Sequence, residues 1–251
     1  LNAHTTYFEL VMRSSDQLSS QAQGDFSVLT QGYARTWSPL TGWSCELGDY
    51  ANYTATRNPA WYLADLWADP IWGEGLPDER IDLKSLYQLS LLWDARQDHF
   101  DFVFDTTMTA WDAAQLIGRA GRAQCFRRFG VNTLSRDELR TLPKTAISRR
   151  TAMPGSMRST EKLPDLDVAD GVIAQYTSNV TWDNDEIECP CPGFTVTDEE
   201  DPRYNPALPK MTRPIYQRVD GIKGAKQVER EGLFMAATMA LRTRTVNCTT
   251  A

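Results

Sequence analysis

Helix-start and helix-stop residues near position 60 constrain the fold of this chain more than any other feature. Asn58 precedes Pro59. Asparagine caps the free N–H groups of a first helical turn, and proline is favoured at the first helical position because its missing N–H is not needed there. Pro70 cannot continue a helix. The sequence therefore predicts a helix over 58–69.

The same signals predict two more helices. Asp82 precedes a leucine-rich run, which predicts a helix over 83–95, and Thr109 precedes a helix over 110–121 that Gly121 ends. The side chains of the second helix expected to pack inward are Leu83, Leu86, Tyr87, Leu89, Leu91 and Leu92. Four tryptophans fall on the apolar stripes of the three helices and are expected in the core: Trp61, Trp67, Trp93 and Trp111.

Strand patterns surround these helices. Phe100, Phe102 and Phe104 alternate with other residues, which is the period of a strand. Further strands are expected over 5–13, 123–129, 131–136 after a hinge at Gly130, 172–176, 186–189 and 243–249. Residues 26–37 are expected to form a second strand or an extended arm. A last helix is predicted over 223–241, with one side formed by Val228, Gly232, Met235, Ala236 and Met239. Residues expected to be irregular are 38–56, a connector, 141–170, a loop or extended crossing, and 198–214.

These elements indicate an α+β fold in three parts. Residues 1–54 form a β-rich arm and connector. Residues 55–140, where helices alternate with strands that return across them, form a small α/β sandwich. Residues 141–251 form a β-rich domain with a long helix near its C-terminal end.

Charge and hydropathy limit the function. With 251 residues and a formal net charge of −7, the chain does not suit a protein whose main task is to grip nucleic acid. A local basic run is expected to be a solvated helix end, with contact to passing DNA as the alternative; it comprises Arg119, Arg122, Arg127 and Arg128. No stretch approaches the roughly 18 consecutive apolar residues of a membrane span. Because the chain starts at Leu1 without a leader, we expect a segment of a longer protein.

No group of reactive side chains stands out, so no catalytic, cofactor-binding or metal-binding residue is predicted. The only close cysteine pair, Cys189 and Cys191, lacks the spacing and the roughly four soft ligands of a zinc site. We expect the cysteines to be reduced. The two histidines, His4 and His99, are far apart, and His99 is expected to be a surface or capping residue.

Two further features leave alternatives open. The acidic cluster Asp198–Asp201 lies in a proline-rich loop and is expected to be solvated, with a calcium site as the alternative. Trp37, Trp43, Trp72 and Trp182 lie in connectors or turns. They are candidates for subunit contacts, and a sugar-binding face is the alternative interpretation.

Short motifs between about 55 and 250 occur in a fixed order. They include Arg57-Asn58-Pro59-Ala60-Trp61-Tyr62, Gly73-Glu74-Gly75-Leu76-Pro77, Ala169-Asp170-Gly171-Val172-Ile173-Ala174-Gln175-Tyr176, Thr181-Trp182, Pro192-Gly193 and Arg230-Glu231-Gly232. This collinear set resembles the tail-tip attachment proteins of lambda-like long-tailed bacteriophages, also called host-specificity or central-fibre proteins. Residues 1–55 match only loosely, and the 198–214 loop is longer and more acidic than is usual in that family.

The resemblance implies a homotrimeric hub that closes the distal end of the tail tube. In that family the β-rich domains form a tube-like barrel, and small α/β domains lie outside it. The hub contacts the distal tail and tail-tip proteins and the tape-measure protein, while more C-terminal regions, absent here, reach the host receptor. The expected location is the virion, after assembly in the bacterial cytoplasm.

From residues and resemblance together we expect a structural component for host attachment and genome ejection, with no enzymatic activity and no cofactor. One alternative is a tail-associated peptidoglycan hydrolase, which needs two carboxylates about 5–10 Å apart. The other is a receptor-binding or glycan-binding module, which predicts exposed, coplanar tryptophans.

Overall fold

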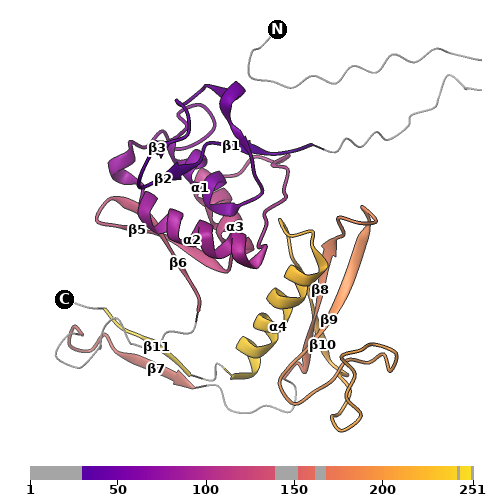
Figure 1. Ribbon diagram of the computed structural model, residues 1–251. Helices are drawn as coiled ribbons and strands as arrows, with labels where there is room; N and C mark the ends of the chain where they lie inside the picture. The colour runs from indigo at the N-terminus through magenta and orange to yellow at the C-terminus, as the bar shows by residue number, and fades with distance from the viewer. Residues whose placement is uncertain (1–29, 139–151, 162–167, 242–243, 250–251) are drawn as a thin grey trace, which may run out of the picture.

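A computed structural model describes residues 30–138, 152–161, 168–241 and 244–249 (Figure 1). Its helices are α1 (Pro59–Ala68), α2 (Leu83–Arg96), α3 (Ala110–Ala120) and α4 (Ala225–Leu241), with 3-10 turns η1 (Tyr50–Asn52) and η2 (Asp78–Arg80). Its strands are β1 (Tyr33–Ala34), β2 (Trp37–Ser38), β3 (Gly42–Trp43), β4 (Thr54–Ala55), β5 (Ala123–Arg128), β6 (Val131–Arg136), β7 (Arg158–Glu161), β8 (Gly171–Thr177), β9 (Asn184–Pro190), β10 (Pro214–Arg218) and β11 (Arg244–Asn247). The expected mixture of helices and strands is confirmed. The strand expected over 5–13 lies outside the described residues.

The strands form small separate sheets. Four two-stranded pairs, β1–β4, β2–β3, β5–β6 and β7–β11, are antiparallel, and the largest sheet has the order β10–β8–β9. Within this sheet β10 runs parallel to β8, while β9 runs antiparallel to it. Among the described residues no sheet closes into a barrel.

Helices α1, α2 and α3, together with β5 and β6, form what we call the three-helix unit, and the predicted caps begin each helix. The Asn58 side chain accepts a hydrogen bond from the Ala60 N–H at 3.0 Å and donates to the Ser90 carbonyl at 2.9 Å. It therefore starts α1 and also fixes α1 against α2. Asp82 and Thr109 cap α2 and α3 in the same way, so all three predicted helices are confirmed.

The core of the three-helix unit contains large side chains with no exposed surface, among them Trp67 and Trp93. The Trp93 indole donates to the Gly121 carbonyl at 2.9 Å, and a Cβ added to Gly121 would lie 2.2 Å from the indole ring. Glycine is thus needed at 121 for this close approach. The inward position predicted for Leu91 is wrong, because the buried stripe of α2 runs through Leu86, and Leu91 falls beyond it with 54% of its surface exposed.

The hairpin of β5 and β6 turns at Phe129 and Gly130, as predicted. Both residues have positive φ, 50° and 82°. Two consecutive positive φ angles are required by the two-residue turn that matches the twist of antiparallel strands. Glycine meets this requirement without strain, and Phe129 projects into solvent at the tip of the hairpin.

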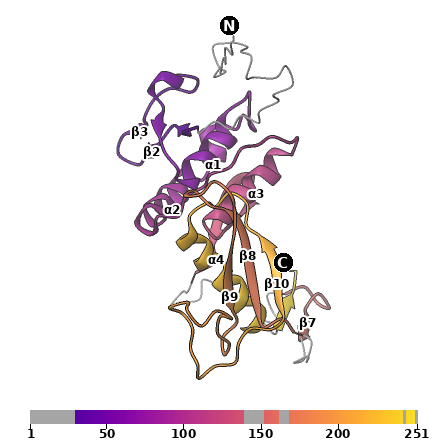
Figure 2. The ribbon, with the colours of Figure 1, turned by 90° about the vertical axis from the view of Figure 1, so that its right-hand side faces the viewer.

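Strands β8, β9 and β10 with α4 form what we call the α4 unit (Figures 1 and 2). Helix α4 packs against β8 and β9, and a Cβ added to Gly232 would lie 2.3 Å from the Cys189 sulfur. The strands predicted at 172–176 and 186–189 and the helix predicted at 223–241 are confirmed. Strand β10 was not predicted, since it starts at a proline and its side chains are largely exposed, so it lacks the alternation of a half-buried strand.

Asp170 ties the irregular segment before β10 to the start of β8. Its carboxylate accepts hydrogen bonds from the Thr212 N–H and hydroxyl and from the Arg213 N–H, at 2.6, 3.0 and 2.8 Å. Burial raises the pKa of the Asp170 carboxyl, but these hydrogen bonds outweigh burial and hold the pKa below its ordinary value. The prediction that 198–214 forms no regular element is confirmed, apart from one bridge residue, Lys210, and the strand start at Pro214.

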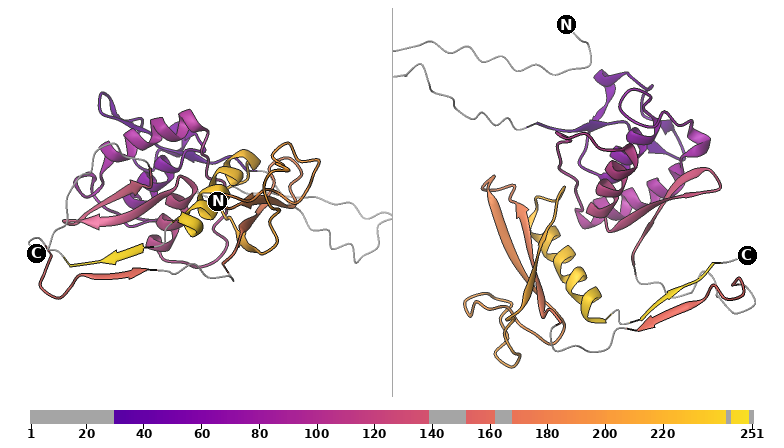
Figure 3. Two further views of the ribbon diagram at one scale, coloured as in Figure 1. Left: turned by 90° about the horizontal axis from the view of Figure 1, so that it is seen from below. Right: turned by 180° about the vertical axis from the view of Figure 1, so that it is seen from behind.

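The remaining ribbon, β7 with β11, extends away from both units (Figures 1 and 3). Strand β7 lies inside 141–170, where a loop or extended crossing was predicted, so that prediction is wrong for Arg158–Glu161. All four residues of β7 are exposed. They carry no apolar periodicity because neither face of β7 is buried, which removes the usual sequence signal of a strand.

Candidate functional site

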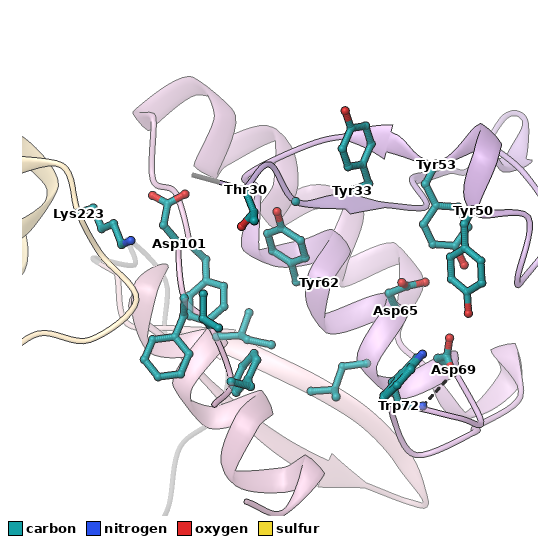
Figure 4. A pocket seen from close by; sticks show the side chains of 17 residues that line it. Thr30, Tyr33, Tyr50, Tyr53, Tyr62, Asp65, Asp69, Trp72, Asp101 and Lys223 are labelled. Carbon is teal, nitrogen blue, oxygen red and sulfur yellow. Dashed lines mark hydrogen bonds between the residues drawn. The ribbon is translucent and has the colours of Figure 1, made fainter. Parts of the chain in front are cut away.

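A cleft of about 620 Å³ on the three-helix unit has many aromatic side chains in its lining, and we call it the aromatic cleft (Figure 4). It lies between the N-terminal strands, α1 and the segment 100–104, and Lys223 reaches it from just before α4. Its lining side chains include Tyr33, Tyr50, Tyr53, Tyr62, Asp65, Asp69, Trp72, Phe100, Asp101, Phe102, Phe104 and Lys223. The sequence patterns did not indicate this site, because its residues come from six separate segments of the chain.

One end of the aromatic cleft is built on the C-terminal end of α1. Asp69 is buried, and one oxygen of its carboxylate accepts hydrogen bonds from the Ile71 and Trp72 N–H groups at 2.7 and 3.0 Å. The turn that results holds Trp72 at the rim with 65% of its surface exposed. One turn earlier on α1, Asp65 accepts a hydrogen bond from Arg35 at 3.1 Å. Burial raises the pKa of the Asp65 carboxyl, and the Arg35 guanidinium opposes that rise.

Tyr62 lies at the middle of the cleft. Its hydroxyl donates to the Thr56 carbonyl, and its ring meets the Phe100 ring edge-on with centroids 6.1 Å apart. Burial, with the nearby charge of Asp101, raises the pKa of Tyr62 to about 12, so its phenol stays protonated at neutral pH. A Cβ at Gly32 would lie 2.1 Å from the Tyr62 oxygen. Glycine at 32 therefore allows the N-terminal strand to cross directly above this phenol.

The other end of the cleft is the aromatic segment 100–104. The strand predicted here is wrong, since none of the described residues pairs with it in a sheet. The Phe100 N–H donates to the Arg57 carbonyl, and the Asp101 N–H donates to the Gly221 carbonyl. The acceptors therefore come from two different segments and not from one neighbouring strand. The alternating phenylalanines instead contact one another, with ring centroids 5.1–6.1 Å apart. Asp101 forms a two-bond pair with Arg57 at 2.8 and 2.5 Å.

A group of buried and half-buried polar side chains joins the three-helix unit to the α4 unit, and we call it the polar seam. Gln227 at the start of α4 is 4% exposed. Its side chain accepts a hydrogen bond from the His99 N–H at 2.9 Å and donates to the carbonyls of His99 and Ala120 at 3.0 and 2.8 Å. One side chain thus satisfies three backbone groups of the three-helix unit.

Ion pairs extend the polar seam along α4. Arg122 pairs with Glu231 at 3.0 Å, and Arg230 pairs with the buried Asp98 at 2.5 Å. Burial raises the pKa of the Glu231 carboxyl despite the neighbouring Arg122. The expectation that the basic run is a solvated helix end is therefore wrong for Arg122, because its side chain is largely buried in an ion pair with Glu231 of α4.

The tryptophan predictions hold in part. Trp61, Trp67 and Trp93 are buried as predicted, whereas Trp111 is only half-buried, with Arg127 5.8 Å above its ring. The hairpin of Arg127 lies over the outer side of Trp111 and leaves part of it in solvent. Of the four tryptophans expected in connectors, Trp72 and Trp182 are exposed, while Trp37 and Trp43 pack against the three-helix unit and are half-buried.

The histidine, the cysteines and the acidic residues considered in the sequence analysis do not lie together in one site. His99 is half-buried at the polar seam, where burial and then Arg57 lower the pKa of its imidazole. Cys189 and Cys191 are buried free thiols, and burial raises the pKa of Cys189 to about 11. In the acidic loop, Asp201 pairs with Arg203 at 2.6 Å and Glu199 with Lys210 at 2.7 Å. Across the described ranges, no group of three or more His, Cys, Asp or Glu residues is placed to hold a metal ion.

No protein-family model and no curated protein sequence matches this chain. In the part of the chain that the structure describes, no helix combines the length and the apolar character that crossing a membrane requires.

Proposed function

We propose that this chain is a structural hub segment of a bacteriophage or prophage tail tip. In this proposal it closes the distal tail tube as a homotrimer, contacts the distal tail, tail-tip and tape-measure proteins, and links the tube to the host-recognition fibre. It acts in the virion, after assembly in the bacterial cytoplasm, and catalyses no reaction. The ordered motifs between about 55 and 250 support this assignment.

The structural observation that carries the proposal is the pair of apolar tips, one on each unit. Phe126 and Phe129 lie exposed on the β5–β6 hairpin, with Phe129 95% exposed, and Val180 and Trp182 lie exposed between β8 and β9. Exposed apolar groups of this kind are typical of interaction sites. A closed ring of three copies uses head-to-tail contacts, which join two different patches of neighbouring subunits. The apolar tip of the β5–β6 hairpin and the apolar tip between β8 and β9 are two such different patches.

The polar seam supports an architectural role as well. Gln227 and the Arg122–Glu231 pair hold the two units in one orientation. A ring subunit needs such rigidity, because an error in the angle between patches accumulates around the ring and prevents closure.

The tube-like barrel belongs to the assembled trimer in this proposal. Among the described residues, β10 lies at the end of the three-stranded sheet and pairs with a strand, β8, on one side only. An open sheet edge pairs readily with another strand. We propose that a neighbouring subunit completes the sheet at the outer edge of β10.

The test is the place of this chain in an intact tail. Antibody fragments raised against it should label the distal end of the tail tube with threefold symmetry, and label elsewhere on the particle would contradict the proposal. In solution, light scattering should distinguish a mass of 28.4 kDa from three times that value. If the trimer forms, Phe129→Asp should return it to monomer, and Leu40→Asp, at another exposed apolar position, should not.

The hydrolase alternative is tested separately. The purified chain, incubated with peptidoglycan, should release no soluble fragments. Release that Asp65→Asn abolishes would refute the non-enzymatic assignment, because burial shifts the pKa of the Asp65 carboxyl upward, the direction that favours a general acid.

A further inference from the structure

We propose that the aromatic cleft is a binding site for a neutral, β-linked oligosaccharide of glucose-type configuration. This inference goes beyond the proposed function and does not depend on it. The class of ligand follows from the two kinds of surface that the cleft presents side by side and from the balance of charge within it.

The apolar surface consists of aromatic rings at both ends of the cleft. Phe102 and Phe104, in the segment that contains Asp101, meet at 5.1 Å between ring centroids. Trp72 is exposed and lies at the end of the cleft opposite Asp101 (Figure 4). In a β-linked glucose-type ring all substituents are equatorial, so both faces of the sugar are flat C–H surfaces. Such faces stack on aromatic rings, and an amphipathic ligand of this shape matches an aromatic wall that also has polar groups beside it.

The polar surface consists of carboxylate oxygens in α1 and at its C-cap that accept no hydrogen bond from the described residues. Arg35 bonds to Oδ1 of Asp65, and the Ile71 and Trp72 N–H groups bond to Oδ1 of Asp69. Among the described residues, neither Oδ2 atom accepts a hydrogen bond. A carboxylate oxygen is a strong acceptor for a hydroxyl donor, because the bond is charge-assisted. Sugar hydroxyls are donors of this kind, spaced at regular intervals along a chain.

Charge balance favours a neutral ligand. Asp65 is compensated by Arg35 and Asp101 by Arg57, and the single positive charge of Lys223 at one end of the cleft equals in magnitude the negative charge of Asp69 at the other end (Figure 4). A cationic or anionic ligand would therefore find little net attraction in the cleft. The volume of about 620 Å³ lies within the roughly 300–1,000 Å³ of small-molecule sites and admits a short oligosaccharide.

The experiment titrates the full chain with cellotetraose and, separately, with tetra-N-acetylchitotetraose, and follows heat and tryptophan fluorescence. We expect saturable binding of at least one of them. Trp72→Ala should weaken that binding at least about tenfold, as expected for the loss of a stacking aromatic ring. Tyr216→Ala is the matched control, because this aromatic residue on β10 is 60% exposed and lies outside the cleft; it should change the affinity by less than about twofold.

A second variant separates binding from folding. Asp65→Asn keeps the shape of the side chain but removes its negative charge and replaces one carboxylate oxygen with an NH₂ group. It should weaken saccharide binding while the far-ultraviolet circular dichroism spectrum stays unchanged. No saturable response to either saccharide up to about 10 mM, which corresponds to a free energy near −3 kcal/mol, would overturn the proposal. So would equal losses for Trp72→Ala and Tyr216→Ala. Binding of the apolar dye ANS in the cleft without any saccharide response would identify an apolar docking surface and also overturn it.

Discussion

The polar seam gives the sharpest prediction, for the change Gln227→Met. Methionine has nearly the volume of glutamine but cannot replace its hydrogen bonds, so the His99 N–H and the carbonyls of His99 and Ala120 lose their partner. An unsatisfied buried group costs about 1–3 kcal/mol. His99 is half-buried and can recover part of this through water. We therefore expect a loss of about 2–4 kcal/mol in the free energy of unfolding.

Urea unfolding with two probes measures this loss. Seven of the eight tryptophans lie between residues 37 and 111, so fluorescence reports mainly on the three-helix unit. Far-ultraviolet circular dichroism reports on both units. In the wild-type chain the two transitions should coincide, because the seam couples the units. In Gln227→Met the midpoints should fall to lower urea and separate.

Gln217→Met is the control, since Gln217 is exposed on β10 and its side chain donates only to the neighbouring Arg218 carbonyl. It should leave both transitions within about 0.5 kcal/mol of the wild type. Equal shifts for the two variants, or no shift for Gln227→Met, would refute the reasoning that this one side chain couples the two units.

Three further predictions concern the α4 unit and the thiols. Gly232→Ala gains up to about 1 kcal/mol of helix propensity, but its Cβ would lie 2.3 Å from the Cys189 sulfur, so overpacking of about 1–3 kcal/mol should dominate and lower the melting temperature. The pKa of Asp170 is held below 3.8, so its stabilising contribution is fully present above pH 3.8 and is lost as pH falls through the folded pKa. Asp170→Asn should accordingly flatten the acid limb of a stability–pH curve, and an unchanged limb would contradict this. With a thiol-reactive dye at pH 8, Cys45 and Cys248, which are half-exposed, should react quickly and the three buried cysteines only on unfolding; five fast thiols would count against the structure.

Local signals in the sequence predicted the elements that carry their own start and stop chemistry. Asn58, Asp82 and Thr109 each cap the expected helix, and Gly130 with Phe129 makes the expected hairpin turn. These features depend on hydrogen bonds between residues a few positions apart, so they can be read without knowing the rest of the fold.

Sequence periodicity failed to predict some strands correctly, because a strand forms only where a second strand pairs with it. The alternation of Phe100, Phe102 and Phe104 indicated a strand, but the described chain offers it no neighbouring strand, and its rings line the aromatic cleft. Conversely, β10 and β7 form by pairing with distant segments and carry no periodicity of their own. Trp111 is half-buried because its cover depends on the position of the hairpin, which a helical stripe does not specify.

By itself, then, the sequence determined where the helices and the tight turn begin and end, because capping and turn formation are local interactions. Tertiary structure alone decided that Gln227 satisfies backbone groups more than a hundred residues away, that Arg122 pairs with Glu231, and that aromatic rings and carboxylates from separate segments share one cleft. The physical reason is that these contacts join groups whose proximity is set by packing of the whole core, which no short window of residues encodes.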